Sequence, residues 1–398
     1  MPANATHSSN MSPSVIVLLL SLLLGLQPVT TDLYLPELTA QLSAPMAQAQ
    51  LTLTALLLAF GGSQLVWGPL SDRFGRRPIL LMGLAAYVLA SVASCLAPSM
   101  GWLIVWRTLQ GAAMGAGVMC ARAIVRDLYS PTQGARVMSK GLSGLGVIAC
   151  LSAPLGGLLT QWLHWRFALL ALGIFAALTL AVVVLRFEET VQQKNPQALQ
   201  LGTLLGTWGQ ILRHPTFRAF SALTAASYGG LFTFLATSSF VFTGVLGLSK
   251  MQYGSVMFVN SAAYIAGTFL CRHWLPRFGV RRAVAFAGVL SLSGGTLMAV
   301  LSLSGWVSVG SILLPQLIFM VGHGIHQPCG QSGAVGPFPQ AAGADSAMNG
   351  VLMMLCAFAM GGWLGVHMNG TVLPLTLGVW FWSALIALSA WTLVQKHG

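Results

Sequence analysis

Asp32 is the first residue in this sequence whose position suggests chemistry, because it places a carboxylate inside the apolar segment 15–38. A carboxylate at depth in a bilayer costs about 2.5 to 3.5 kcal/mol, so it is kept where it faces a bundle interior or a water-filled cavity. Burial and a nearby cation shift the protonation of a carboxylate in opposite directions, so a change of surroundings can load and release a proton. We therefore predict a proton-coupling role for Asp32. The alternative is a solvated residue at a helix end.

Arg107 is the predicted partner of Asp32. Its apolar segment runs opposite to the first one, and at 1.5 Å per residue both side chains lie about 9 Å inside the same boundary. An arginine at matching depth is the natural partner of an intramembrane acid. Gln110, one turn from Arg107, extends this network and, like Tyr34 beside Asp32, is a candidate for substrate contact. The alternative is a permanent ion pair that only fixes helix packing.

A second group of charges gathers where apolar segments end. Asp72, Arg73 and Arg76 lie in the turn after the second segment, and Arg126 and Asp127 close the fourth segment on the same side. Partly wet ion pairs of this kind contribute little to stability individually. We therefore predict that these five residues form a conformational latch.

His323 and His326 lie one helical turn apart in the tenth apolar segment. A zinc site needs four ligands, and no Cys or acid is placed to complete one, so no metal is predicted. The two imidazoles are candidates for contact with a substrate or a proton, or else a buried hydrogen-bonded pair. Further candidates for a substrate cavity are Tyr228, Phe232 and Asn260, with plain helix packing as the alternative for the aromatic residues.

The composition indicates that these residues are held in a membrane. Of 398 residues, 56% are hydrophobic and 7% are charged, whereas about a quarter of a soluble protein is charged. The missing charge belongs to surface that meets lipid, so we predict a polytopic membrane protein with the bilayer as its partner. The net charge of +12 does not indicate nucleic acid, because the basic residues are spread over several loops. No nucleophile–base or nucleotide-binding motif occurs, so neither an enzyme nor a cofactor is predicted, and a channel or an intramembrane enzyme is the remote alternative.

Twelve segments are long enough, at roughly 20 residues, to cross a hydrocarbon core of about 30 Å. Basic residues concentrate in alternate loops, which the positive-inside rule assigns to the cytoplasm. Because the number of spans is even, both termini are then expected in the cytoplasm. The predicted spans are residues 15–38, 51–71, 78–97, 101–126, 137–161, 165–186, 215–245, 252–274, 282–303, 306–329, 344–367 and 371–394.

The sequence divides near its middle, where a polar stretch interrupts the apolar segments. Residues 72–77 (DRFGRR) also have a weaker echo at residues 276–281 (PRFGVR). Equivalent loops in two halves indicate a duplicated unit. We therefore predict an all-α membrane protein with two pseudo-symmetric six-helix halves, residues 1–187 and 213–398, joined by a cytoplasmic linker at residues 188–212.

Three motifs resemble those of the major facilitator superfamily. Residues 68–78 (GPLSDRFGRRP) resemble its cytoplasmic loop motif. Residues 107–111 (RTLQG) resemble the fourth-span motif of its proton-coupled members. Residues 152–157 (SAPLGG) resemble the fifth-span motif of its antiporters, with Ala153 in place of the usual glycine.

Further stretches are similar to the Bcr/CflA group of drug:proton antiporters, namely residues 31–36 (TDLYLP), 121–127 (ARAIVRD) and 337–343 (PFPQAAG). This resemblance covers nearly the whole chain and implies a twelve-helix alternating-access fold, export of small organic compounds and proton exchange. The acid of the first span in that group corresponds to Asp32, and its fourth-span arginine corresponds to Arg107. Its loop cluster corresponds to Asp72, Arg76 and Asp127.

Two functions fit this sequence. The first is a proton-coupled efflux antiporter for drugs or other small molecules, working as a monomer in the bacterial inner membrane. The alternative is a narrow-specificity purine, nucleoside or amino-acid transporter on the same fold. His323 and His326 lie where such proteins usually look more apolar, so the substrate stays open at this point.

Overall fold

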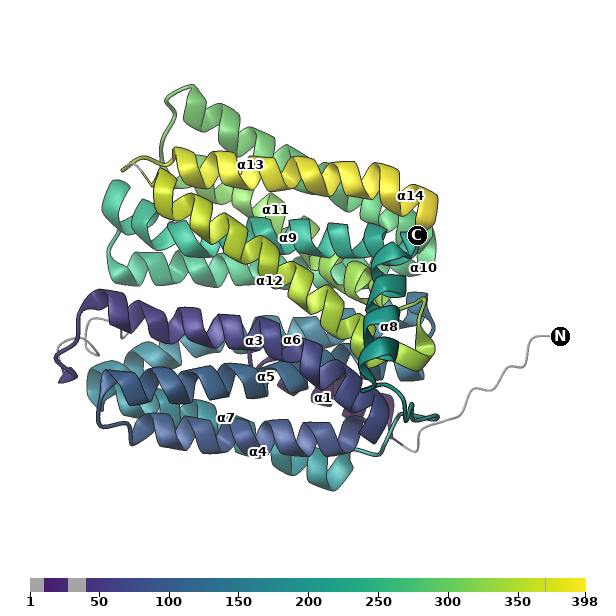
Figure 1. The fold of residues 1–398 in the computed structure, drawn as a ribbon. Helices are drawn as coiled ribbons and strands as arrows, with labels where there is room; N and C mark the ends of the chain where they lie inside the picture. The colour runs from purple at the N-terminus through teal and green to yellow at the C-terminus, as the bar shows by residue number, and fades with distance from the viewer. Residues whose placement is uncertain (1–10, 28–40, 369) are drawn as a thin grey trace.

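The computed structural model describes residues 11–27, 41–368 and 370–398, which form helices joined by short connections (Figure 1). Asp32 and Tyr34 lie outside the described residues. The helices are α1 (Pro13–Leu24), α3 (Met46–Phe74), α4 (Arg76–Cys95), α5 (Met100–Leu128), α6 (Pro131–Trp162), α7 (Trp165–Arg186), α8 (Leu201–Arg213), α9 (Pro215–Ser239), the π-helical η2 (Phe240–Val245), α10 (Lys250–Leu303), α11 (Val309–Ala334), the short 3-10 turn η3 (Pro339–Ala341), α12 (Ala342–His367), α13 (Leu373–Leu388), the π-helical η4 (Ser389–Leu393) and α14 (Val394–His397).

The helices coincide with the predicted spans. Within the described residues, nine helical segments are long and apolar enough to cross a membrane. Of these, α10 contains both the eighth and the ninth predicted span. The two spans are separated at Gly279, where the backbone leaves the helical conformation. α6 covers the fifth predicted span, and α1, with 12 residues, covers the start of the first, whose residues 28–38 lie outside the described part of the chain. The prediction of an all-α membrane fold with twelve spans is confirmed.

Two glycines turn the chain at equivalent places in the repeated motif. Gly75, between α3 and α4, has φ 107°, and Gly279 has φ 70°. Glycine adopts positive φ without the steric cost that a side chain brings, so the echo in sequence is also an echo in backbone conformation. The surroundings differ, since a Cβ on Gly75 would collide with the Glu189 carboxylate, whereas nothing described lies within 4 Å of one on Gly279.

The helices lie in two groups (Figure 1). In that view α1 and α3 to α7 form the lower group and α9 to α13 the upper one. We call the end of the molecule where α3 meets α4 and α5 meets α6 the basic end, because it carries Arg76, Arg77 and Arg126. Both π-helical segments lie in the upper group, after α9 and after α13.

A helix also occurs inside the predicted linker. α8 lies across the basic end in Figure 1, and its 13 residues are too few to cross a bilayer. Trp208 and Ile211 pack against the protein, whereas Leu201 and Leu205 are exposed. A search for membrane spans misses such a helix because it is short and only half apolar.

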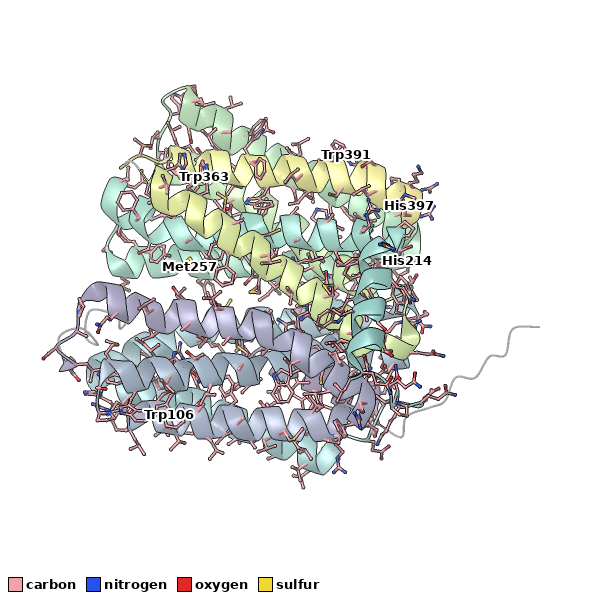
Figure 2. The ribbon with its side chains drawn as sticks, viewed as in Figure 1. Trp106, His214, Met257, Trp363, Trp391 and His397 are labelled. Carbon is pink, nitrogen blue, oxygen red and sulfur yellow. The ribbon has the colours of Figure 1, made fainter. Side chains whose placement is uncertain are left out.

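Aromatic side chains lie toward both ends of the molecule (Figure 2). Trp106 and Trp363 lie toward the end opposite the basic end, whereas His214 and His397 lie at the basic end. The Trp106 ring stacks on Trp102 with ring centroids 6.1 Å apart. Tryptophan is enriched at membrane–water interfaces, where its amphipathic ring sits at headgroup level. These rings are therefore placed as expected for helices that end at an interface.

Candidate functional site

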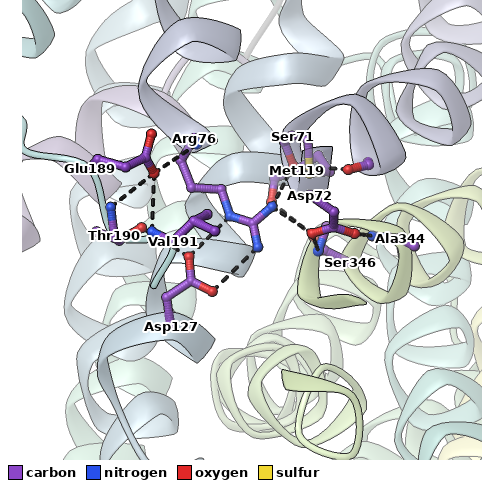
Figure 3. Close-up of polar contacts among 12 residues, drawn as sticks. Ser71, Asp72, Arg76, Met119, Asp127, Glu189, Thr190, Val191, Ala344 and Ser346 are labelled. Carbon is purple, nitrogen blue, oxygen red and sulfur yellow. Dashed lines mark hydrogen bonds and ion pairs between the residues drawn. The ribbon is translucent and has the colours of Figure 1, made fainter. Parts of the chain in front are cut away.

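The guanidinium of Arg76 holds together the charged cluster at the basic end (Figure 3). It donates from Nη1 to Asp72 Oδ1 (2.7 Å) and to Ser71 Oγ (2.6 Å). It also donates from Nε to Asp127 Oδ2 (3.0 Å) and from Nη2 to Asp127 Oδ1 (3.3 Å). Arg76 and Asp72 are only 2% and 4% exposed, so these charge-assisted bonds are shielded from water. The structure thus brings together three of the five predicted latch residues.

The segment that follows α7 completes this cluster. Glu189 accepts hydrogen bonds from the backbone N–H groups of Arg76 (2.9 Å) and Arg77 (3.1 Å), at the first turn of α4. A carboxylate is favoured there because the first N–H groups of a helix have no partner within it. Thr190 donates to Asp127 Oδ2 (2.9 Å). Sequence reasoning missed Glu189. The chain has only seven acids, so considering each of them in turn would have identified Glu189 as a candidate.

Asp72 connects the two groups of helices. Its Oδ1 accepts from the backbone N–H of Gly343 (2.8 Å) and its Oδ2 from that of Ala344 (2.9 Å), both in the first turn of α12. The two helices approach closely at glycines, since a Cβ on Gly68 would lie 2.6 Å from the Gly343 carbonyl oxygen. One carboxylate therefore binds an arginine of the lower group and the N-terminus of a helix of the upper group.

Two predicted latch residues lie outside this cluster. Arg73 is exposed, with its guanidinium 5.3 Å from the centre of the Phe74 ring. Adjacent residues of a helix do not face the same side, so Arg73 does not join Asp72 in this cluster, and its role in a latch stays a prediction. Arg126 instead donates from Nε to the Gly336 carbonyl oxygen (2.9 Å). It thus makes a separate contact between α5 and the segment after α11.

Further polar contacts join the two groups near the basic end. Between α6 and α10, Ser139 donates to the Thr268 carbonyl oxygen (2.7 Å) and Arg272 donates to Ser143 Oγ (2.8 Å). Ser332 of α11 donates to the Pro131 carbonyl oxygen (2.9 Å). Each contact pairs a side chain of one group with the other group, so they must break if the two groups separate at this end.

One more contact of this kind lies deeper. Ser346, in the second turn of α12, donates to the Met119 carbonyl oxygen of α5 (2.9 Å). Together with the bonds from Asp72, it fixes the first two turns of α12 against α3 and α5.

The predicted contact between Arg107 and Gln110 is present. Arg107 donates from Nη1 to Gln110 Oε1 (2.6 Å), and Gln110 donates from Nε2 to Ser91 Oγ (2.7 Å). Arg107 is 1% exposed and Gln110 is fully buried. The predicted partner Asp32 lies outside the described residues, so the proton-coupling role of this network stays a prediction.

The two histidines contact different helices. His323 is paired through Nδ1 with Ser227 Oγ of α9 (2.8 Å), and its ring lies 5.4 Å from that of Tyr264. His326 is fully buried on the side of Ala287, in the part of α10 beyond Gly279. The pair therefore does not form one face toward a common cavity.

The remaining cavity candidates are distributed over the upper group. Asn260 is buried and accepts from Gln316 Nε2 of α11 (3.4 Å). Phe232 lies against α12 at Gly361, and Tyr228 is half-buried in the main core. Among the residues that the structure describes, no cluster of three or more metal-ligating side chains occurs.

Arg122 is a buried cation that sequence reasoning quoted in a motif but did not select. It donates from Nη2 to Gln64 Oε1, and its Nε has no hydrogen-bond partner among the described residues. A cavity of about 20 Å³ between the two helix groups is lined by Arg122, Gln64 and Gln331. That is room for about one water molecule, which needs polar partners of this kind.

The comparison with protein families identifies the class. Residues 17–362 match the model of the Major Facilitator Superfamily, which is more than half of the chain. The chain therefore belongs to this superfamily of transporters and is a multi-pass membrane protein.

Within the superfamily, the chain is similar to drug-resistance proteins. It is 29% identical over 340 residues to "Multidrug resistance protein D" of Escherichia coli, covering 85% of each chain. It is 27% identical over 373 residues to the "Bicyclomycin resistance protein homolog" of Haemophilus influenzae, covering 92% of each. It is 30% identical over 359 residues to the "Chloramphenicol resistance protein" of Pseudomonas aeruginosa, covering 86% of this chain and 82% of that one. The resemblance to the Bcr/CflA group is confirmed.

A solved structure shows the same fold. The proton:xylose symporter XylE superposes with a TM-score of 0.77 at 14% identity, covering 97% of this chain and 96% of that chain. At this identity the likeness concerns the arrangement of helices alone.

Proposed function

We propose that this protein is a proton-coupled antiporter that exports small organic compounds, including drugs, by alternating access. The names of its relatives support the substrate class, because they refer to resistance to several drugs, to bicyclomycin and to chloramphenicol. The observation that carries the alternating-access mechanism is the bond from Asp72 to the first turn of α12, because it joins the two helix groups at one end.

We place the basic end in the cytoplasm of a bacterium, with the spans in its inner membrane and both termini inside. The moving bodies are the proposed six-helix halves, residues 1–187 and 213–398, joined by the linker 188–212. A single chain holds both halves, so we propose a monomer. With its basic-end contacts made, the molecule is closed toward the cytoplasm, which is the state that releases substrate outward.

The transport cycle follows from the two sets of charges. Asp32 takes a proton from outside and releases it inside, and Arg107 favours its ionised form when the two lie close. Asp72, Arg76 and Asp127 hold the cytoplasmic side closed until substrate or proton occupancy separates the halves. A ligand shifts such an equilibrium only by its differential affinity for the two states.

Transport in proteoliposomes tests this proposal. Asp32→Asn keeps the size of the side chain but cannot exchange a proton, so uptake driven by a pH gradient should be lost while the protein stays folded. The matched control is Glu188→Gln, an exposed acid at the basic end, which should transport normally. Full pH-driven uptake by Asp32→Asn would overturn the proton-coupling assignment. Counterflow with panels of drugs, nucleosides and amino acids separates efflux of drugs from the narrow-specificity alternative.

A further inference from the structure

Asp345 is a buried acid that the mechanism above does not use. It lies in the first turn of α12, next to the two residues whose N–H groups bind Asp72, and it is fully buried. Neither of its carboxyl oxygens has a hydrogen-bond partner in the described part of the chain. A buried ionised carboxylate without partners is strongly unfavourable, and in practice such a group becomes neutral instead. The burial of Asp345 without hydrogen-bond partners therefore favours its protonated, neutral form.

The two charges that act most on Asp345 oppose each other, and the larger effect disfavours its ionised form. Asp72 of α3 acts on it as a like charge, and the ion pair with Arg76 favours the ionised form of Asp72. Arg126 of α5 acts as an opposite charge that favours the ionised form, and its effect on Asp345 is smaller than that of Asp72. The other charged or titratable side chains at this end of the neighbouring α8 and α9 are Arg213, His214 and Arg218. None of these three has an appreciable electrostatic effect on Asp345.

The location of Asp345 couples this proton to the conformation. The first turns of α12 are fixed to the lower helix group by Asp72 and Ser346, so Asp345 is buried only while that contact is closed. If the two groups separate at the basic end, the same turn meets water, and an aspartyl group in water is ionised at neutral pH. Burial of one turn thus decides whether the carboxyl can lose its proton.

We propose that Asp345 is a second proton-binding site, which holds a proton while the basic end is closed and releases it when that end opens. The moving parts are those of the proposed function, on which this inference rests. The proton comes from and returns to water on the same side, so none crosses the membrane at Asp345. In the pH range where only the closed state keeps the proton, the ratio of closed to open molecules falls by up to tenfold for each unit of rising pH. An acidic cytoplasm holds the cytoplasmic side closed and so slows further proton entry.

Distance measurements between spin labels across the basic end test this directly. They are made on the full chain in detergent without substrate, over a series of pH values, in the Asp32→Asn background, which removes the other proposed proton site. The ratio of closed to open molecules should fall by up to tenfold for each unit of rising pH. Asp345→Asn, which imitates the protonated form, should stay closed at every pH. Glu188→Gln is the matched acid-to-amide control and should keep the pH dependence. An unchanged pH dependence in Asp345→Asn would overturn the proposal.

Infrared spectroscopy gives a second measurement that does not depend on conformational change. The closed protein should show the carbonyl band of a protonated carboxylic acid, which disappears in Asp345→Asn and shifts in Asp345→Glu. If Asp345→Asn does not fold, Asp345→Glu carries the test, because it keeps a titratable group. Absence of any change in this band would also count against the proposal. Loss of transport in Asp32→Asn bears on the proposed function alone, so failure of either idea is recognised separately.

Discussion

Oδ1 of Asp72 and the backbone nitrogen of Gly343 lie 2.8 Å apart, and a Cβ on Gly343 would lie 2.7 Å from the same oxygen. The hydrogen bond therefore requires a residue without a side chain at this position. The Gly68 carbonyl oxygen adds to this requirement, because it would lie 2.5 Å from that Cβ. The contact between α3 and α12 therefore needs both this glycine and the acid.

We expect Gly343→Ala to open the basic end. The methyl group must displace either Asp72 or the backbone of α3, and overpacking of this kind costs about 1 to 3 kcal/mol. The ratio of open to closed molecules should therefore rise by about 5- to 150-fold. The accessibility of an engineered cysteine from the cytoplasmic side measures this ratio. Gly362→Ala on the same helix is the control, because nothing described lies within 4 Å of its Cβ. Equal accessibility in the two variants would show that the approach of α3 and α12 is not needed for closure.

Asp72→Asn should weaken closure without reducing substrate affinity. The amide offers one acceptor oxygen where the carboxylate offers two, so one of the N–H groups of Gly343 and Ala344 loses its partner. The ion pair with Arg76 is lost as well. Hydrogen bonds to charged groups contribute about 1.5 to 3 kcal/mol, so transport should fall while the substrate Kd in equilibrium binding stays nearly constant. A large loss of affinity with normal conformational exchange would contradict a latch.

Arg76→Lys should impair transport although the charge is kept. The guanidinium reaches Asp72 through Nη1 and Asp127 through Nε and Nη2, which a single ammonium group cannot reproduce. We expect a lower Tm and a larger open fraction. Arg73→Lys is the control, because Arg73 is exposed outside the cluster. A normal Tm and normal transport in Arg76→Lys would show that charge alone holds the cluster together.

His323→Leu should destabilise the protein through Ser227. The substitution leaves the Ser227 hydroxyl, which now pairs with His323 Nδ1 at 2.8 Å, without this partner in a buried place. The loss of unfolding free energy should be about 1 to 3 kcal/mol. In a double-mutant cycle, Ser227→Ala together with His323→Leu should cost less than the sum of the two single changes. A changed rank order of transported compounds in His323→Leu, with an unchanged Tm, would assign the imidazole to substrate binding instead.

Much of the fold follows from hydropathy, because a span must bury about 20 residues in lipid. α8 does not follow, since only one of its faces packs on the protein, and its length is below that of a span. The bond from Asp72 to Gly343 and Ala344 could not be predicted either. Its donors are backbone N–H groups, which every residue except proline carries, so no residue type marks them.

Asp345 and Arg73 show which criteria the sequence reasoning lacked at this site. The rule that marked Asp32, an acid inside an apolar segment, applies equally to Asp345 and would have found it. Arg73 was predicted together with Asp72 and Arg76 as part of one charged turn. In the structure Arg73 faces another side of α3, whereas Arg76 pairs with Asp72 from the first residue of α4, after the turn at Gly75. The direction of the chain at Gly75 was therefore the missing criterion within the motif, and burial was the missing one outside it.

In the contact between α3 and α12 the acceptor is a side chain, Asp72, whereas the donors are backbone N–H groups. Mutations therefore affect the two sides of the contact differently. A substitution keeps the backbone N–H group unless the new residue is proline, although a side chain too large for the space displaces it. Drift along the first turn of α12 thus leaves the donors in place, and Ala344 can change more freely than Asp72. Heritable loss of the proposed latch should accordingly concentrate in Asp72 and in the glycines where α3 crosses α12, Gly68 and Gly343.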